Sequence, residues 1–246
     1  MFEERFYREF HQNENMSKIQ VTVDESDVLV IIDPVDTHEK LKEIIHGEIK
    51  RLRRILNGYI KRVPEFESSL KPLEMQGDNE EIIQRMYKAS ALAHVGPMAC
   101  VAGIVSELIA EFLLEKYIGL DNVLVENGGD IYLHSSINRK ISIYAGQSPL
   151  SNQLSIQIKE KQMPIGICTS AGTVGHSLSF GQADAVVVIS KDTALADGVA
   201  TYIGNITILP ADIENSLKTA MAIEGIEGVV IIVGETLGAL GEIEFV

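Results

Sequence analysis

The sequence predicts an α+β fold in which helices pack on mixed β-sheets, as a single domain over residues 1–246. Segments with apolar residues at helical spacing dominate up to residue 121, and short apolar runs separated by polar turns dominate afterwards. Helices and strands interleave without strict alternation, which favours α+β over a doubly wound sheet. A finer division into interleaved lobes of about 1–120 and 121–246 stays open.

The first half predicts a hairpin followed by helices. IQVTVDESDVLVIID reads as two strands joined by a turn around Glu25–Ser26. Thr37 is expected to cap a long helix, because apolar residues then recur at three-four spacing from Leu41 to Leu56. A polar connector with two prolines follows. Two more helices are then expected, over about Asn79–Ala93 and Pro97–Tyr117.

Basic residues gather on the long helix or just beyond it: Arg51, Arg53, Arg54, Lys61 and Arg62. A solvated helix face, or favourable charge near the helix C-terminus, is favoured over phosphate binding as the interpretation.

After residue 121 the sequence predicts short strands, two helices and a closing hairpin. The expected strands are NVLVENGGDIYLH (two strands around a turn), KISIYAG, NQLSIQIKEK, IGICTSAG and DAVVVIS. The helices are expected over about Leu195–Gly204 and Ile213–Ala222, and the hairpin over about 228–246. The hairpin could be a sheet edge that pairs with a second subunit, so a homo-oligomer is one expectation.

Composition and charge exclude several classes of protein. The net charge of −14 argues against a general nucleic-acid binder, which needs a basic face, but leaves room for a local pocket that binds a small anion. The most apolar segment is interrupted by Glu107, Glu111 and Glu115, which we interpret as the wet face of an amphipathic helix rather than part of a membrane span.

The location is expected to be cytoplasmic. Residues 1–18 are charged and lack the apolar region of a signal peptide. The two cysteines, Cys100 and Cys168, have no metal-binding spacing and are too few for a disulfide framework.

The segment VENGGDIYL contains the first candidate site. Asn127, Gly128, Gly129 and Asp130 lie between two expected strands. Asn-Gly is a favoured hairpin turn, so a purely structural turn is the favoured interpretation in isolation. Consecutive glycines also let a ligand approach the backbone closely, with Asp130 pointing at it.

The segment CTSAGTVGH contains the second candidate site. Small and hydroxyl residues at a strand end, including Thr169 and Ser170, let backbone N–H groups face a phosphate. The Gly-Lys-Ser/Thr ending of a P-loop is missing. His176 could be a ligand, a proton carrier or a turn residue that only forms hydrogen bonds.

The segment SKDTALADGVAT contains the third candidate site. Asp197 and Thr201 are four residues apart, so a helix would put both on one face. A carboxylate and a hydroxyl suit a hard cation such as Mg²⁺, which leaves room for substrate phosphates. The alternative is that Asp197 or Thr193 caps the helix.

Along the chain, a helix of small residues is followed by NGGDI, TSAG, a strand and ADGVAT. This order of motifs resembles that of the ApbE-like superfamily of flavin transferases. The resemblance implies the ApbE-like fold, which is related to the T-fold. The resemblance covers roughly Pro97–Val246 and, more faintly, the first half. It implies enzymes that cleave FAD at its pyrophosphate, pass FMN to a threonine hydroxyl of a target protein and release AMP, with Mg²⁺ neutralising the phosphates.

The resemblance also implies roles for individual residues. Asp197 and Thr201 match the metal-binding pair, and a backbone carbonyl from about Ala99 to Val101 would complete the protein part of the metal site. Gly128, Gly129 and Asp130 match a motif beside the flavin-nucleotide pocket. The Thr-Ser-Gly strand end of the family matches Thr169, Ser170 and Gly172 here.

The sequence departs from the family pattern near the phosphates. The family's Ala-Lys-Gly has Ala102 in place of the lysine, and its His-Ile-Ile-Asp-Pro block is replaced by HSLSFGQA, which keeps only His176. Three functions therefore stay open: an Mg²⁺-dependent flavin or nucleotide enzyme, a metal-dependent enzyme for another small anion, and a non-catalytic flavin-binding protein.

Overall fold

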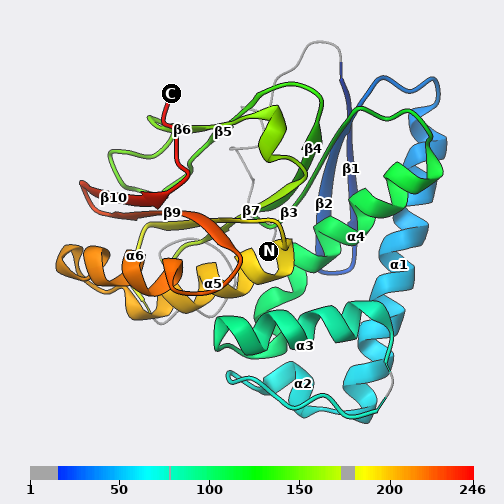
Figure 1. Cartoon of the computed structure of the whole chain (residues 1–246). Coiled ribbons are helices and arrows are strands. Elements are labelled where there is room, and N and C mark those ends of the chain that lie inside the picture. The colour runs from blue at the N-terminus through cyan, green and yellow to red at the C-terminus, as the bar shows by residue number, and fades with distance from the viewer. Residues whose placement is uncertain (1–15, 78, 173–180) are drawn as a thin grey trace.

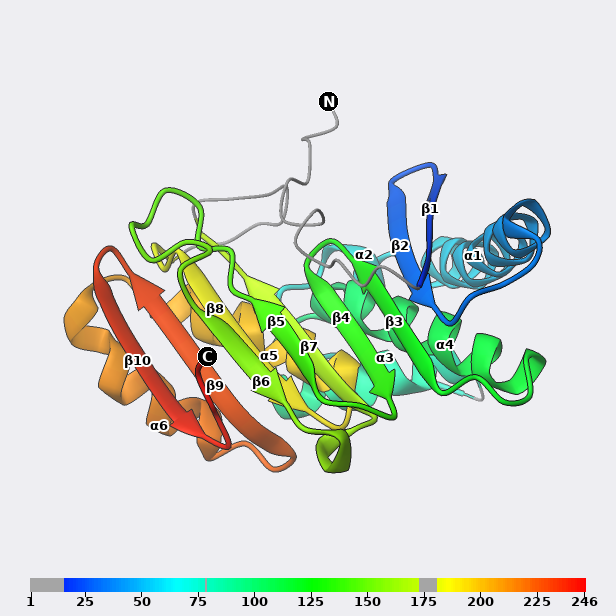
Figure 2. The same cartoon turned by 90° about the horizontal axis from the view of Figure 1, so that it is seen from above.

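The computed structural model describes residues 16–77, 79–172 and 181–246. An eight-stranded sheet forms its middle layer, with helices on one face and a two-stranded sheet on the other (Figures 1 and 2). The α+β fold predicted from the sequence is confirmed.

All neighbouring strands of the large sheet are antiparallel. In spatial order its strands are β1 (Ser17–Val23), β2 (Ser26–Ile32), β3 (Asn122–Asn127), β4 (Asp130–Ser135), β7 (Ile165–Ser170), β8 (Ala185–Ser190), β9 (Ile226–Val233) and β10 (Thr236–Gly241). The small sheet pairs β5 (Arg139–Ser142) with β6 (Ser155–Ile158).

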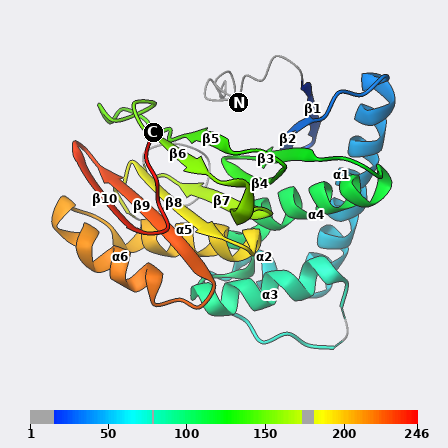
Figure 3. The same ribbon diagram turned by 45° about the horizontal axis from the view of Figure 1, so that its top comes forward.

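The helices lie against successive parts of the large sheet. They are α1 (His38–Arg62), α2 (Glu65–Ser68), α3 (Glu81–Ala93), α4 (Val101–Lys116), α5 (Thr193–Ile206) and α6 (Ile213–Met221), with short 3₁₀ turns at Pro97–Cys100, Glu160–Gln162 and Pro210–Asp212. α1 packs on β1, α4 on β3 and β4, α5 on β7 and β8, and α6 on β9 and β10. Figure 3 shows α4, α5 and α6 beneath the sheet. α3 contacts α4 and α5 in turn.

Each face of the large sheet has its own apolar core, because side chains alternate along a strand. On β3, Val123 and Val125 pack with the helices, whereas Leu124 packs with the small sheet. This double burial explains why the strands read as continuous apolar runs rather than alternating ones.

Several local predictions are confirmed. The N-terminal and C-terminal hairpins form as expected, and β10 is an edge strand of the sheet. A two-residue turn joins β3 and β4 as expected, but its residues are Gly128 and Gly129, with φ of 69° and 104°, because Asn127 pairs with Asp130 at the strand ends. Thr37 occupies the N-cap position of α1, but its side chain makes no capping hydrogen bond.

The interpretation of Glu107 as part of a wet helix face is wrong. Its side chain is buried at 5% exposure, whereas Glu111 is half-buried and Glu115 is exposed. One helical segment in the described part of the chain, Pro97–Lys116, is long and apolar enough to cross a membrane, but 56% of its apolar window is buried inside the fold, as expected for a core helix.

Candidate active site

Two glycines let α5 approach its neighbours closely: Gly103 on α4 faces α5, and Gly198 on α5 faces the 3₁₀ turn before α4 and the end of α3. A Cβ on Gly103 would lie 2.4 Å from the carbonyl oxygen of Thr193 and 2.8 Å from the Cβ of Asp197. A Cβ on Gly198 would lie 2.8 Å from the Sγ of Cys100. Distances this short leave no room for a side chain, so the α4–α5 crossing depends on Gly103, and the packing of α5 on the 3₁₀ turn depends on Gly198.

At this crossing each helix caps the other. Asp197 on α5 accepts hydrogen bonds from the backbone N–H groups of Gly103, at 2.8 Å, and Ala102, both in the first turn of α4. Glu107 on α4 accepts a hydrogen bond of 3.0 Å from the backbone N–H of Thr193, the first residue of α5. Because the first N–H groups of a helix lack partners within the helix, each carboxylate stabilises the start of the other helix.

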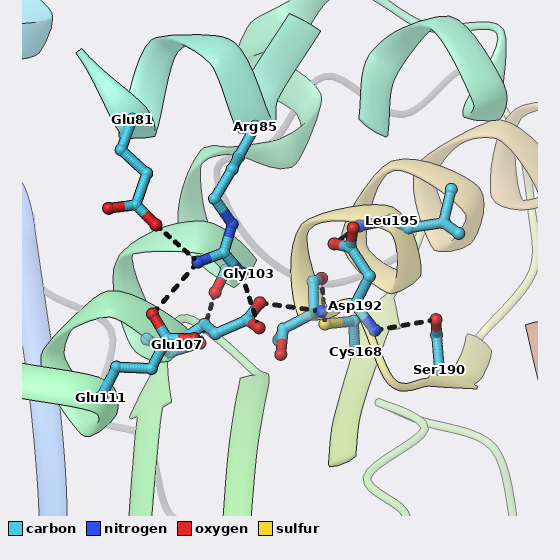
Figure 4. Close-up of polar contacts among 11 residues, drawn as sticks. Glu81, Arg85, Gly103, Glu107, Glu111, Cys168, Ser190, Asp192 and Leu195 are labelled. Atoms are coloured by element: carbon cyan, nitrogen blue, oxygen red, sulfur yellow. Dashed lines mark hydrogen bonds and ion pairs between the residues drawn. The ribbon is translucent and has the colours of Figure 1, made fainter. Parts of the chain in front are cut away.

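α5 also has a cap of its own. The side chain of Asp192 accepts a hydrogen bond from the backbone N–H of Leu195 (Figure 4). The capping interpretation of Asp197 or Thr193 is therefore wrong for α5, although Asp197 serves a capping role for a different helix.

Arg85 on α3 compensates the buried charge of Glu107. Its guanidinium lies 2.6 Å from Glu107, 3.1 Å from Glu111 and 3.4 Å from Glu81 (Figure 4). Burial raises the pKa of Glu107, and the positive charge of Arg85 opposes that shift. This cluster locks α3, α4 and the start of α5 together, which fixes the position of Asp197 one turn later.

A second buried carboxylate, Asp130, begins β4 directly after the glycine turn. It accepts a 3.2 Å hydrogen bond from the backbone N–H of Thr169 and is hydrogen-bonded to the thiol of Cys168. Its pKa lies well above the ordinary value, first because of burial and then because of the negative charge of Asp197. Asp130 is 6% exposed and Asp197 is 8% exposed.

Burial raises the pKa of Asp197 to about 7, while its hydrogen bonds to Gly103 and Ala102 act in the opposite direction. No lysine or arginine in residues 16–77, 79–172 and 181–246 forms an ion pair with Asp197 or Asp130. Two carboxylates that repel each other in a buried site without a cation form an environment that is typical of functional sites.

Polar groups from the strand ends surround this pair. The amide of Asn127 donates a 3.2 Å hydrogen bond to the carbonyl oxygen of Ala102, which ties the glycine turn to α4. The carboxylate of Glu126 accepts from the backbone N–H of Gly129 at 2.7 Å and steadies the turn. Thr169 and Ser170 end β7 and are half-buried.

Some of the predicted site residues form hydrogen bonds with one another or with the first turn of α4, and others only lie on neighbouring parts of the chain. Asp130 contacts Thr169, and Asp197 and Asn127 both contact the first turn of α4. Thr201 is half-buried on α5, one turn after Asp197. Ala99 is half-buried in the 3₁₀ turn before α4, where its N–H donates to Gly96. His176 lies outside the described residues.

Sequence reasoning missed Cys168, Arg85 and the buried role of Glu107. Cys168 lies between Asp130 and the Thr193 carbonyl, whose oxygen is 3.4 Å from its sulfur, and its single S–H proton can be donated to either oxygen. Burial and the nearby carboxylates raise the pKa of this thiol well above its ordinary value, so it stays protonated. The available sequence signal for Cys168 was its position inside the strand IGICTS, which predicts a buried side chain. The structure places it on the sheet face that packs against the helices.

Comparison with known proteins shows the family of the chain. A family model described as "AbpE bacteria" matches residues 8–244. A UPF0280 protein of Methanococcus aeolicus is 42% identical over 83% of this chain and 84% of its own, and one of Methanocaldococcus jannaschii is 36% identical over 92% and 91%.

The chain belongs to the ApbE-like superfamily and to its UPF0280 family.

Solved structures of ApbE proteins share its fold. The flavin transferase ApbE of Vibrio cholerae is 14% identical, with a TM-score of 0.53 over 92% of this chain and 96% of that one. The ApbE protein of Thermotoga maritima is 13% identical, with a TM-score of 0.59 over 92% and 97%. At such identities the ApbE-like similarity concerns the fold alone.

Proposed function

We propose that this ApbE-like protein is a divalent-cation-dependent enzyme acting on a flavin nucleotide, and that it transfers FMN from FAD. The observation that carries the proposal is the buried pair Asp130 and Asp197, whose pKa values are raised by burial and which have no ion-pair partner among the described residues. Perturbed carboxylates of this kind are costly in a purely structural role.

The donor set fits Mg²⁺. A carboxylate offers about four lone-pair positions, and backbone N–H groups use two on Asp197, so acceptor capacity remains for a cation. Thr201 adds a hydroxyl one helical turn away, and Asp130 adds a second carboxylate. Oxygen donors of this type suit a hard cation that keeps several positions for water and substrate. Among the described residues no cluster of three or more histidine, cysteine, aspartate or glutamate side chains could hold a metal, which favours a site completed by substrate phosphates.

When bound, the cation would neutralise the charge of the FAD pyrophosphate. The residues of the chain would do the rest by positioning. Asn127 and the glycine turn would border the nucleotide, and the half-buried Thr169 and Ser170 would face its phosphates from the end of β7. The bond between the FMN phosphorus and the bridging oxygen breaks, AMP leaves with that oxygen, and an acceptor hydroxyl bonds to phosphorus after losing its proton.

One observation favours a second candidate, a metal-dependent enzyme for a different small anion. Ala102 occupies the position where the resemblance calls for lysine, and its carbonyl is already engaged by Asn127. The described site residues therefore offer a phosphate no basic side chain, so a substrate with fewer negative charges than FAD would fit better.

The test is calorimetric titration of FAD into the protein with Mg²⁺ and with EDTA, followed by chromatography of each mixture for FMN and AMP. Wild-type protein is expected to bind FAD only with Mg²⁺ and to release AMP, with water replacing the protein acceptor. Asp197→Asn and Thr201→Val should abolish both effects, whereas Asp36→Asn, at an exposed aspartate before α1, should change neither. FAD binding without turnover would leave a flavin-binding role, and no binding at all would favour the second candidate.

A further inference from the structure

A polar hollow lies on α1, away from the carboxylate pair. It has a volume of about 440 Å³ and is lined by one face of α1 and by the end of β1, with no residue from α4, α5 or β4. Figures 1 and 3 show α1 beside β1 at one edge of the sheet. Its lining residues are Val23, Asp24, Lys50, Arg53, Arg54, Asn57, Gly58 and Lys61.

This hollow concentrates positive charge on a strongly acidic protein. Four of its eight lining residues are basic and one is acidic, whereas the chain as a whole carries a net charge of −14. Arg53 is committed to the β1–β2 turn, where it pairs with Asp24 and Glu25. Lys50, Arg54 and Lys61 form no ion pair with any residue in the part of the chain that the structure covers.

The α1 sequence at this hollow is unfavourable for an isolated helix. Lys50 and Arg54 are four residues apart, so their like charges repel on one face. Gly58 lies inside a 25-residue helix, where glycine is less stable than alanine. A Cβ added to Gly58 would have no heavy atom within 4 Å, so packing within the described structure does not require glycine.

Helix electrostatics explain only part of this arrangement. Lys61 lies in the last turn of α1, where positive charge is favourable. Lys50 and Arg54 lie well before that turn, and the helix dipole acts only near the ends. The repulsion between Lys50 and Arg54 and the glycine at position 58 lower the stability of α1 without improving packing. Such features are expected at ligand-binding sites.

We infer that this hollow binds a phosphorylated small molecule of about nucleotide size. Lys50, Arg54 and Lys61 would hold its phosphates, and the absent side chain at Gly58 would let its body lie against the helix backbone. The hollow is open to solvent, so it would contact one side of the bound molecule and leave the other side exposed. The whole lining belongs to α1 and the end of β1, so this inference stands apart from the proposed function.

The test is calorimetric titration of ATP into the protein in EDTA. Without a divalent cation, the carboxylate pair repels a polyphosphate, which restricts binding to the basic hollow. Wild-type protein is expected to bind ATP, and Lys50→Gln with Arg54→Gln should weaken binding by about tenfold or more, because two charge-assisted contacts are lost. Asp36→Asn, at an exposed aspartate outside the hollow, should leave this binding unchanged.

Two glycines of α1 provide a matched pair of variants. Gly47 and Gly58 both lie inside the helix, both are exposed, and an added Cβ meets nothing at either position. Alanine at either should raise the Tm by about 2–4 °C, since helix propensity improves equally. Only Gly58→Ala should weaken ATP binding, because Gly47 does not line the hollow.

Three results would overturn the inference. The first is an absence of ATP binding in EDTA. The second is equal ATP affinity in the two alanine variants. The third is binding that survives Lys50→Gln with Arg54→Gln, which would place the ATP site outside the hollow and leave the proposed function intact.

Discussion

Asp197→Asn is expected to stabilise the metal-free protein at alkaline pH, although it alters a buried residue with two hydrogen bonds. In the folded protein burial raises the pKa of Asp197 to about 7, from an ordinary value of 3.8. Between these values the folded state binds more protons than the unfolded state, so the free energy of unfolding falls as pH rises. The penalty is complete once the pH passes the folded pKa.

The magnitude follows from this shift. A difference of about three pKa units corresponds to up to about 4 kcal/mol lost at pH 8, of which about 2–3 kcal/mol is lost between pH 5 and pH 8. Asparagine keeps one oxygen as an acceptor for the first turn of α4 but gives up the stronger charged bonds, at a cost of about 1 kcal/mol. The variant should therefore melt about 5–10 °C above wild type at pH 8 and close to wild type at pH 5.

The assay is thermal unfolding in EDTA by calorimetry or circular dichroism, at half-unit steps from pH 5 to pH 8. Asp36→Asn is the control, since it makes the same chemical change at an exposed position. Adding Mg²⁺ at pH 8 should raise the Tm of wild type and leave that of Asp197→Asn unchanged, because only an ionised carboxylate attracts the cation.

A variant that melts below wild type at both ends of the pH range would refute this reasoning. It would mean that Asp197 stays in the fold chiefly as an anchor for the first turn of α4. A magnesium effect equal in both proteins would place the cation elsewhere and would count against the proposed function.

Three further substitutions test the helix crossing by thermal unfolding. Gly103→Ala should destabilise the fold by about 1–3 kcal/mol or more, because the new methyl group would overlap the Thr193 carbonyl at 2.4 Å; an unchanged Tm would show that the helices can separate freely. Arg85→Met should cost about 3 kcal/mol by leaving Glu107 buried without its cation, and adding Glu107→Gln should recover part of the loss; a second change that adds to the loss would contradict this pairing. Thr193→Val should raise stability by about 1 kcal/mol, because the Thr193 hydroxyl is a buried polar group without a hydrogen-bond partner among the described atoms; a lower Tm would indicate an unseen partner.

The elements of the fold could be predicted from the sequence because their signals are local. The three-four spacing of α1, the glycine turn between β3 and β4, and the apolar runs of β8 and β9 each depend on neighbouring residues. The strand order could not be predicted, since β4 pairs with β7 across a segment that contains β5 and β6.

The candidate site shows the same division. The sequence by itself determined that Asp197 and Thr201 share one helix face and that Asp130 follows a glycine turn, because both statements concern residues within four positions of each other. Only the tertiary structure decided that Asp197 caps α4 through the N–H of Gly103, 94 residues earlier in the chain, and that Glu107 is buried beside Arg85 instead of facing water. Burial and long-range contact set the charge state of these carboxylates, and neither is encoded in local spacing. A glutamate spaced like its exposed neighbours can therefore become part of the core.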